Sequence, residues 1–170
     1  EREAAAEVAK VPVEPGAYMV DGGQMKAIKP AEVTLVMDKK RRILQVITPA
    51  PILSGKGWVE MKGETSANVA PSNTPEFYLR LEKEERFGII RLTPGKGVRV
   101  VEKVSVIPVA NQIEEQQDQV EVFRRQLGAG LYKIWPIKPL EPGEYAVMEF
   151  TPAETEGIKL QAWDFSVRNR

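Results

Sequence analysis

Cysteine and histidine are both absent from the 170 residues of this chain. Without cysteine, the chain cannot form a disulfide framework, a thiolate nucleophile or a cysteine-type zinc site. Without histidine, it lacks the commonest general base and the commonest transition-metal ligand. These absences exclude Ser-His-Asp and Cys-His catalytic triads. We therefore predict that the protein is not an enzyme and that it uses no cofactor.

An excess of either charge is also absent, and so are long apolar runs. Lys and Arg total 24, as do Asp and Glu, so the net charge is zero and no global field attracts nucleic acid. No apolar run approaches the roughly 20 residues that span a bilayer, and we predict no membrane span. The chain begins at Glu1, which a removed signal peptide and a cloning boundary explain equally well. We expect export to the periplasm or out of the cell.

The stretch from Leu140 to Phe150 carries the clearest structural signal. Pro142 presets the first central angle of a type II turn, and Gly143 accepts the positive φ at the second. Leu-x-Pro-Gly-x-Tyr resembles the tyrosine corner of Greek-key β-sandwiches, in which the hydroxyl bonds to backbone a few residues upstream. We expect the Tyr145 ring to be buried and its hydroxyl to bond backbone near residues 135–140. The apolar run that follows is typical of a strand covered on both sides.

A shorter copy of this signal lies near the start of the chain. Glu14-Pro15-Gly16-Ala17-Tyr18 repeats the Glu-Pro-Gly-x-Tyr pattern, and Asp21-Gly22-Gly23 has the chemistry of a hairpin turn. Because Pro-Gly before an aromatic strand is a common way to begin a strand, the copy is weak evidence for an internal duplication. We expect Tyr18 to be more exposed than Tyr145.

Period-two alternation marks the later strands. Phe77, Leu79 and Leu81 alternate with polar or aromatic neighbours and share one face. Trp163, Phe165 and Val167 do the same at the end of the chain. Ile158 and Leu160 are out of phase with that last set, which predicts a β-bulge near Gln161.

About a dozen short strands separated by turn signals, with no amphipathic helix, predict an all-β fold. We expect a Greek-key, immunoglobulin-like β-sandwich with a small N-terminal β-hairpin subdomain. We predict that the chain is divided into a flexible lead over 1–10, the small β subdomain over 11–50 and the sandwich over 51–170. Thr48-Pro49-Ala50-Pro51 marks the boundary. Residues 113–127 contain helix-forming residues but no apolar stripe. Two interpretations of this segment remain open: a helix, or a loop followed by a strand. We favour the second, with a hairpin that turns at Gly128-Ala129-Gly130.

Several segments of the later part resemble a family of bacterial, exported β-sandwich proteins whose activity is unassigned. The resemblance covers most of the chain, and its motifs are signals of turns and core packing. It implies the fold and carries over no activity. The segments are Pro75–Leu79, Gly128–Ile134, Leu140–Ala146 and Trp163–Val167, although Ser166 stands where such chains often carry Gly.

Exposed aromatic side chains are the best candidates for ligand contact. Trp58, Trp135 and Trp163, with Tyr78 and Tyr132, either include a stacking platform for sugars or pack in the core. Trp163 alternates with core residues, so we assign it to the core. Trp135 lies beside Pro136 at the end of a strand, and it is our candidate ligand-stacking residue.

The remaining motifs indicate ordinary loops. Lys39–Arg42 is typical of a solvated hairpin tip. Ser54–Gly57 and Pro94–Gly97 lack the glycine spacing of a phosphate-binding loop and are predicted turns. The pairs Glu84-Glu85 and Glu114-Glu115 are expected to be solvated. No loop has the ligand spacing of a calcium site, and we predict neither catalytic nor metal-binding residues.

The sequence thus predicts a non-enzymatic module with an interaction or structural role and an unidentified protein or glycan partner. A carbohydrate-binding module that uses exposed aromatics is the alternative. The oligomeric state does not follow from the residues. Because no side chain present has a reference pKa between those of the carboxylates and Tyr or Lys, we expect stability to be nearly flat from about pH 6 to 8.

Overall fold

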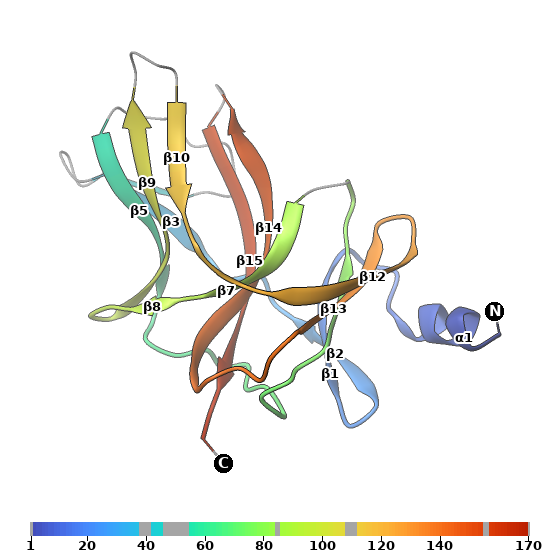
Figure 1. Cartoon of the computed structure of the whole chain (residues 1–170). Helices are drawn as coiled ribbons and strands as arrows, with labels where there is room; N and C mark the ends of the chain where they lie inside the picture. Colours follow the sequence, from blue (N-terminus) through green and yellow to red (C-terminus); the bar gives the residue numbers. More distant parts are fainter. Residues whose placement is uncertain are drawn as a thin grey trace.

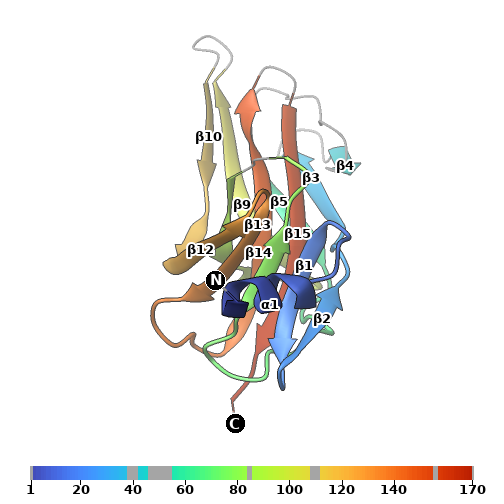
Figure 2. The same ribbon diagram turned by 90° about the vertical axis from the view of Figure 1, so that its right-hand side faces the viewer.

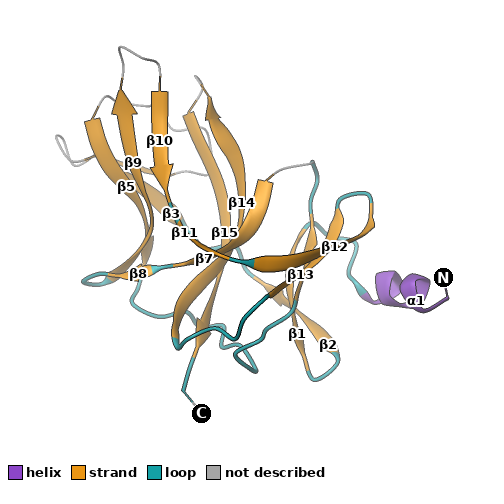
Figure 3. Ribbon diagram, in the orientation of Figure 1, coloured by secondary structure: helices purple, strands orange, loops and turns teal. Residues whose placement is uncertain are grey.

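The computed structural model of the chain is nearly all β, as predicted, and describes residues 2–37, 42–45, 55–83, 86–107, 112–154 and 157–169. These residues form one helix, α1 (Arg2–Lys10), and fifteen strands in three antiparallel sheets (Figures 1 and 3). The predicted all-β sandwich class is confirmed, and its strands are distributed over three layers.

We name the sheets A, B and C. Sheet A has the order β12 (Val122–Gly128), β13 (Leu131–Pro136), β6 (Phe77–Arg80), β1 (Gly16–Asp21) and β2 (Gln24–Ile28). Sheet B has the order β11 (Asp118–Val120), β7 (Arg86–Arg91), β14 (Gly143–Glu154) and β15 (Gly157–Val167). Sheet C has the order β10 (Gln112–Gln116), β9 (Val98–Ile107), β5 (Gly55–Lys62), β3 (Val33–Met37) and β4 (Arg42–Gln45), and β8 (Thr93–Pro94) also pairs with β9.

Sheet B is the middle layer, with sheet C on one side and sheet A on the other (Figure 1). Successive residues of its strands belong alternately to two cores. Ile90, Ala146 and Ala162 pack against sheet C, whereas their neighbours face sheet A. The side chains of sheet B that face sheet A are Phe87, Ile89, Tyr145, Val147, Trp163, Phe165 and Val167.

Burial on both faces explains the apolar run in β14. Residues 145–148 are each at most 2% exposed, so neither face of the strand reaches solvent there. Tyr145 pairs with Phe165 on β15 and with Arg91 on β7, which fixes the register of the middle layer. The strand predicted to be covered on both sides is one of the two inner strands of the middle sheet.

The tyrosine corner is present. The ring of Tyr145 is 2% exposed, and its hydroxyl donates a 2.7 Å hydrogen bond to the carbonyl oxygen of Glu141, one residue beyond the expected range. The predicted positive φ at Gly143 is wrong, because Gly143 opens β14 in pairing with Val167. A Cβ at Gly143 would lie 3.3 Å from the guanidinium of Arg91, so the close approach of Arg91 accounts for the glycine.

The N-terminal copy of the motif forms a second corner. The hydroxyl of Tyr18 donates a 2.6 Å hydrogen bond to the carbonyl oxygen of Glu14, and Tyr18 is only 4% exposed. Tyr18 is therefore slightly more exposed than Tyr145, as expected, although both tyrosines are buried. The predicted hairpin is confirmed, with Gly22 and Gly23 at positive φ in the two-residue turn between β1 and β2.

The expected flexible lead is an ordered helix. Figure 2 shows α1 lying across the outer face of sheet A, the face turned away from sheet B. Val8 packs there against a cluster that includes Val11 and Tyr78. The carboxylate of Glu7 accepts hydrogen bonds from the Tyr78 hydroxyl and from the guanidinium of Arg125. These tertiary contacts order a segment whose own sequence has no continuous apolar stripe.

Strands from the two sides of the predicted boundary at residue 50 share sheets. β1 pairs with β6 in sheet A, and β3 pairs with β5 in sheet C. The boundary residues 48–51 lie outside the described part. Residues 112–128 form β10, β11 and β12 in succession, at the edges of sheets C, B and A respectively, and the favoured hairpin into β13 is confirmed.

Two local predictions are wrong. Gln161 pairs with Glu149 without a register shift, because Leu160 faces sheet C while Trp163 faces sheet A, and no bulge is needed to bury both. The sequence predicts a turn over residues 54–57, but Gly55–Gly57 begins strand β5 instead. The turn predicted over Pro94–Gly97 is present between β8 and β9.

Candidate functional site

Trp135 lies on the outer face of sheet A, because the adjacent residue Ile134 points into the core. Its partner across the ladder is Phe123 on the edge strand β12. The two ring centroids are 5.6 Å apart and the planes are tilted by 34°. Trp135 is half-buried, whereas Phe123 is 47% exposed, so the pair presents an aromatic edge to solvent.

Two cations occupy the next rung on the same face. Arg125 and Lys133 are direct cross-strand partners, and Lys133 Nζ lies 5.6 Å from the centroid of the Trp135 ring. We call Phe123, Arg125, Lys133 and Trp135 the outer A surface. Like charges in direct register repel each other, and this pair is bridged by Glu7 of α1.

Glu7 is the acceptor that holds α1 to this surface. The hydrogen bond from the Tyr78 hydroxyl, followed by the charges of Arg125 and Lys133, lowers the pKa of Glu7 despite its burial. Burial and the bond to Glu7 raise the pKa of Tyr78, so the phenol stays neutral. Lys133 Nζ also lies 3.0 Å from Glu76 Oε1, which fixes the ammonium beside the indole of Trp135.

The other two tryptophans are divided between core and surface. Trp163 is 1% exposed and belongs to the core between sheets A and B, as expected. Trp58 is half-buried on the outer face of sheet C, since Val59 points inward. Its indole Nε1 donates a 2.8 Å hydrogen bond to Glu60 Oε2 on the same strand. Tyr132 packs against Phe87 at a centroid distance of 4.6 Å and belongs to the interior.

A pair of buried carboxylates lies where the chain passes from sheet C to sheet B. Glu102 on β9 is 2% exposed, and its Oε2 accepts a 2.7 Å hydrogen bond from Gln117 Nε2. Oε1 of Glu102 and Oε1 of Glu115 are buried without a hydrogen-bond partner in the described part of the chain. Burial and then the nearby Glu115 raise the pKa of Glu102 to about 7.

Glu115 is not the solvated residue that its sequence context indicates. Burial raises its pKa, and the positive charge of Arg86 partly offsets that effect. Its neighbour Glu114 is exposed. Alternation along β10 places the two glutamates on opposite faces, and a run of helix-forming residues hides that alternation in the sequence. The pair Glu84-Glu85 lies outside the described residues.

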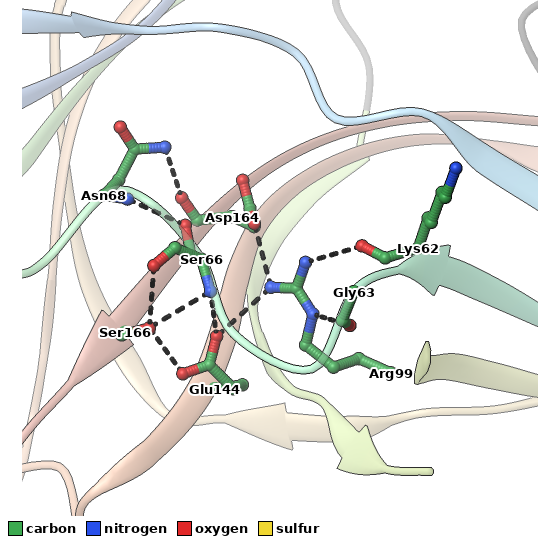
Figure 4. A network of polar contacts seen from close by, with 8 residues as sticks. All are labelled: Lys62, Gly63, Ser66, Asn68, Arg99, Glu144, Asp164 and Ser166. Atoms are coloured by element: carbon green, nitrogen blue, oxygen red, sulfur yellow. Dashed lines mark hydrogen bonds and ion pairs between the residues drawn. The ribbon is translucent and has the colours of Figure 1, made fainter. Parts of the chain in front are cut away.

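Arg99 organises the largest buried polar network (Figure 4). Arg99 is 2% exposed, and its Nη1 lies 2.8 Å from Asp164 Oδ2 and 3.2 Å from Glu144 Oε1. The remaining guanidinium nitrogens donate to the carbonyl oxygens of Gly63 and Lys62, at 2.9 Å and 3.2 Å. Four hydrogen-bonding groups from three strands and a loop thus meet at one side chain.

Serines complete this network. The Ser66 backbone N–H donates to Glu144 Oε1 at 2.6 Å, and the Ser166 hydroxyl donates to the other oxygen of Glu144. Asn68 Nδ2 donates to the Asp164 carbonyl oxygen at 3.1 Å. Every charged group has partners, so the network fastens the loop after β5 to sheets B and C. It leaves no free nucleophile, and its position suits a structural role.

The described residues offer no metal-binding cluster and no membrane-crossing helix. They contain no group of three or more acidic side chains placed to hold a metal ion. They also contain no helix with the length and apolar character that crossing a membrane requires.

Pro142, predicted as a structural residue, is exposed, and its carbonyl oxygen accepts a 3.4 Å hydrogen bond from Arg91.

Comparison with protein-family models, curated proteins and solved structures gives no match for this chain. The resemblance to bacterial exported β-sandwich proteins therefore stays a prediction.

Proposed function

We propose that this protein is a non-enzymatic binding module and that the outer A surface is its contact face for a protein partner. The observation that carries the proposal is the exposed Phe123 beside Trp135, with Arg125 and Lys133 on the adjacent rung. Tryptophan and arginine are enriched among the residues that dominate binding energies at protein interfaces. Export remains part of the proposal and is checked by fractionating the source cells.

The rigidity of this surface favours recognition over chemistry. Both strands belong to a five-stranded sheet, and Lys133 is fixed by Glu76 at 3.0 Å. A preorganised contact face loses little side-chain entropy on binding. The four side chains are two aromatic rings and two cations, so the surface offers apolar contacts and positive charge to a partner.

The partner that fits this surface is an acidic protein segment with an apolar anchor. Phe123 and Trp135 provide the apolar contact, and the two cations favour carboxylates beside it. Ile137, just past the end of β13, is 44% exposed and extends the apolar area. The 34° tilt between the rings of Phe123 and Trp135 gives a bent aromatic edge, which suits a side-chain anchor better than a flat sugar ring.

The test is cross-linking in extracts of the source cells. A photo-reactive phenylalanine analogue replaces Phe123 in one sample and Val13, which is 80% exposed but outside the surface, in the other. We expect a discrete acidic partner to be captured from position 123 and not from position 13. Its capture should weaken when Lys133→Ala and Arg125→Ala are introduced and when salt is raised. Equal capture from both positions, or none, would contradict the proposal.

A further inference from the structure

The outer face of sheet C carries a groove with a volume of about 510 Å³. This volume falls within the range of about 300–1,000 Å³ that is usual for small-molecule sites. The groove lies over β5, β9 and β10, on the opposite side of the molecule from the outer A surface (Figure 1). Its polar and aromatic side chains on the outer face are Lys56, Trp58, Lys103, Ser105, Glu114 and Gln116.

The register of the three strands explains why these side chains meet. Trp58 pairs with Lys103, and Lys103 pairs with Gln116, which makes one row across the sheet. Lys56, Ser105 and Glu114 form the neighbouring row through the same two ladders. Directly opposed residues of an antiparallel pair point to the same face, so both rows project into the groove.

Trp58 is held in place inside this groove. Its Nε1 donates to Glu60 Oε2 at 2.8 Å, which occupies the polar edge of the indole. Trp58 is half-buried, so part of its indole surface remains open to the groove. An indole fixed in this way forms a preorganised stacking surface, so little rotamer freedom is lost when a ligand stacks on it.

We propose that the groove is a carbohydrate-binding site with a preference for acidic sugars. A pyranose ring has an apolar C–H face for the indole and hydroxyls that both donate and accept hydrogen bonds. The two rows supply donors from Lys56 and Lys103, an acceptor from Glu114 and groups with both capacities from Ser105 and Gln116. Lys103 is the direct cross-strand partner of Trp58, and Lys56 lies in the neighbouring row, whereas the indole of Trp58 already engages the Glu60 carboxylate. Two cations beside the stacking surface favour a uronic acid over a neutral sugar.

This site is independent of the proposed protein contact. Trp58 and Trp135 lie on outer faces of different sheets, and no residue is shared between the groove and the outer A surface. A variant that removes one function should leave the other intact. The two proposals can therefore fail separately.

The test is calorimetric titration of the whole chain with three probes: an oligogalacturonide, a neutral cello-oligosaccharide and a single-stranded oligodeoxynucleotide. We expect the oligogalacturonide to bind with a Kd below about 1 mM and more tightly than the neutral sugar. Trp58→Ala should weaken it by about tenfold or more, since the stacking surface is lost. Lys103→Met should reduce the preference for the acidic sugar and leave the neutral sugar unaffected.

Trp135→Ala is the matched control, because it removes a half-buried indole from the other outer face. It should leave the sugar affinity unchanged. Circular dichroism confirms that each variant is folded, and Trp58→Phe, which keeps an aromatic ring, should bind between the parent and Trp58→Ala. Absence of sugar binding at millimolar concentrations, tighter binding of the oligonucleotide, or loss with Trp135→Ala alone would overturn the proposal.

Discussion

The hydroxyl of Tyr18 donates a hydrogen bond to the carbonyl oxygen of Glu14, four residues upstream, at 2.6 Å. Tyr145 has the same relationship with Glu141 at 2.7 Å. One corner precedes β1 of sheet A, and the other precedes β14, an inner strand of sheet B. Two strands separated by more than a hundred residues thus begin with the same tyrosine-to-backbone hydrogen bond.

The two corners should make similar contributions to stability. Tyr18→Phe and Tyr145→Phe each keep a ring that is at most 4% exposed and leave a carbonyl oxygen without its donor. We expect each change to lower the free energy of unfolding by about 1–3 kcal/mol. Urea unfolding measures both, and Tyr132→Phe is the control, because that hydroxyl bonds none of the described residues and should cost only a few tenths of a kcal/mol. A loss at Tyr145 alone would show that the N-terminal corner contributes nothing.

Arg99→Met should be among the most destabilising substitutions in the chain. It leaves Glu144 and Asp164 facing each other without the cation that both contact. Breaking a buried ion pair from one side costs about 3–5 kcal/mol. Arg91→Met is the matched control, because the bridge from Arg91 to Glu141 is exposed and contributes at most about 1 kcal/mol. Thermal unfolding of the two variants should differ by several degrees, and equal melting temperatures would contradict the structural role of the network.

Stability should fall between about pH 5 and pH 7, contrary to the flat profile that composition predicts. Burial raises the pKa of Glu102 to about 7, so the folded state binds a proton that the unfolded state has already released above its ordinary pKa of 4.5. The resulting destabilisation is absent below pH 4.5, grows as pH rises and is complete above pH 7. Its full size is of the order of 3 kcal/mol.

Glu102→Gln isolates this effect. It removes the titrating proton while keeping an acceptor for Gln117, so the variant should be more stable than the parent at pH 8 and similar to it at pH 4.5. Urea unfolding across that pH range gives the profile. Glu114→Gln, at an exposed neighbour of the other glutamate, should leave the pH dependence unchanged. Parallel profiles for the parent and Glu102→Gln would show that Glu102 is ionised normally.

Gly57→Ala should distort sheet C. A Cβ there would lie 2.5 Å from the carbonyl oxygen of Val36, which belongs to the backbone of the neighbouring strand and cannot rotate away. We expect a loss of about 1–3 kcal/mol, the usual cost of overpacking. Gly128→Ala is the control, because nothing lies within 4 Å of its Cβ position, and that change should be neutral or slightly stabilising. Chemical denaturation of both variants decides the matter.

Local signals in the sequence determined the strands, the turns and the corner. The two-residue periodicity that groups Phe77, Leu79 and Leu81 is a property of neighbouring residues, and so is the alternation of Trp163 and Phe165. The Leu-x-Pro-Gly-x-Tyr pattern is likewise local, since the Tyr145 hydroxyl bonds a carbonyl only four residues upstream, which is why Tyr145 and its carbonyl partner could be predicted closely. Turn chemistry acts over two residues, and it located the Gly22-Gly23 hairpin.

Only the tertiary structure decided which of these strands share a core and which polar side chains meet. Arg99 and Asp164 are 65 residues apart, so nothing near either one indicates the other. The same is true of the groove beside Trp58, because its two rows depend on the register of three strands rather than on any short motif. Glu102 looks like an ordinary surface glutamate in the sequence, yet in the fold it is buried and Gln117 donates a hydrogen bond to its carboxylate. Burial, the main cause of its raised pKa, is set by the packing of distant strands and not by the order of its neighbours.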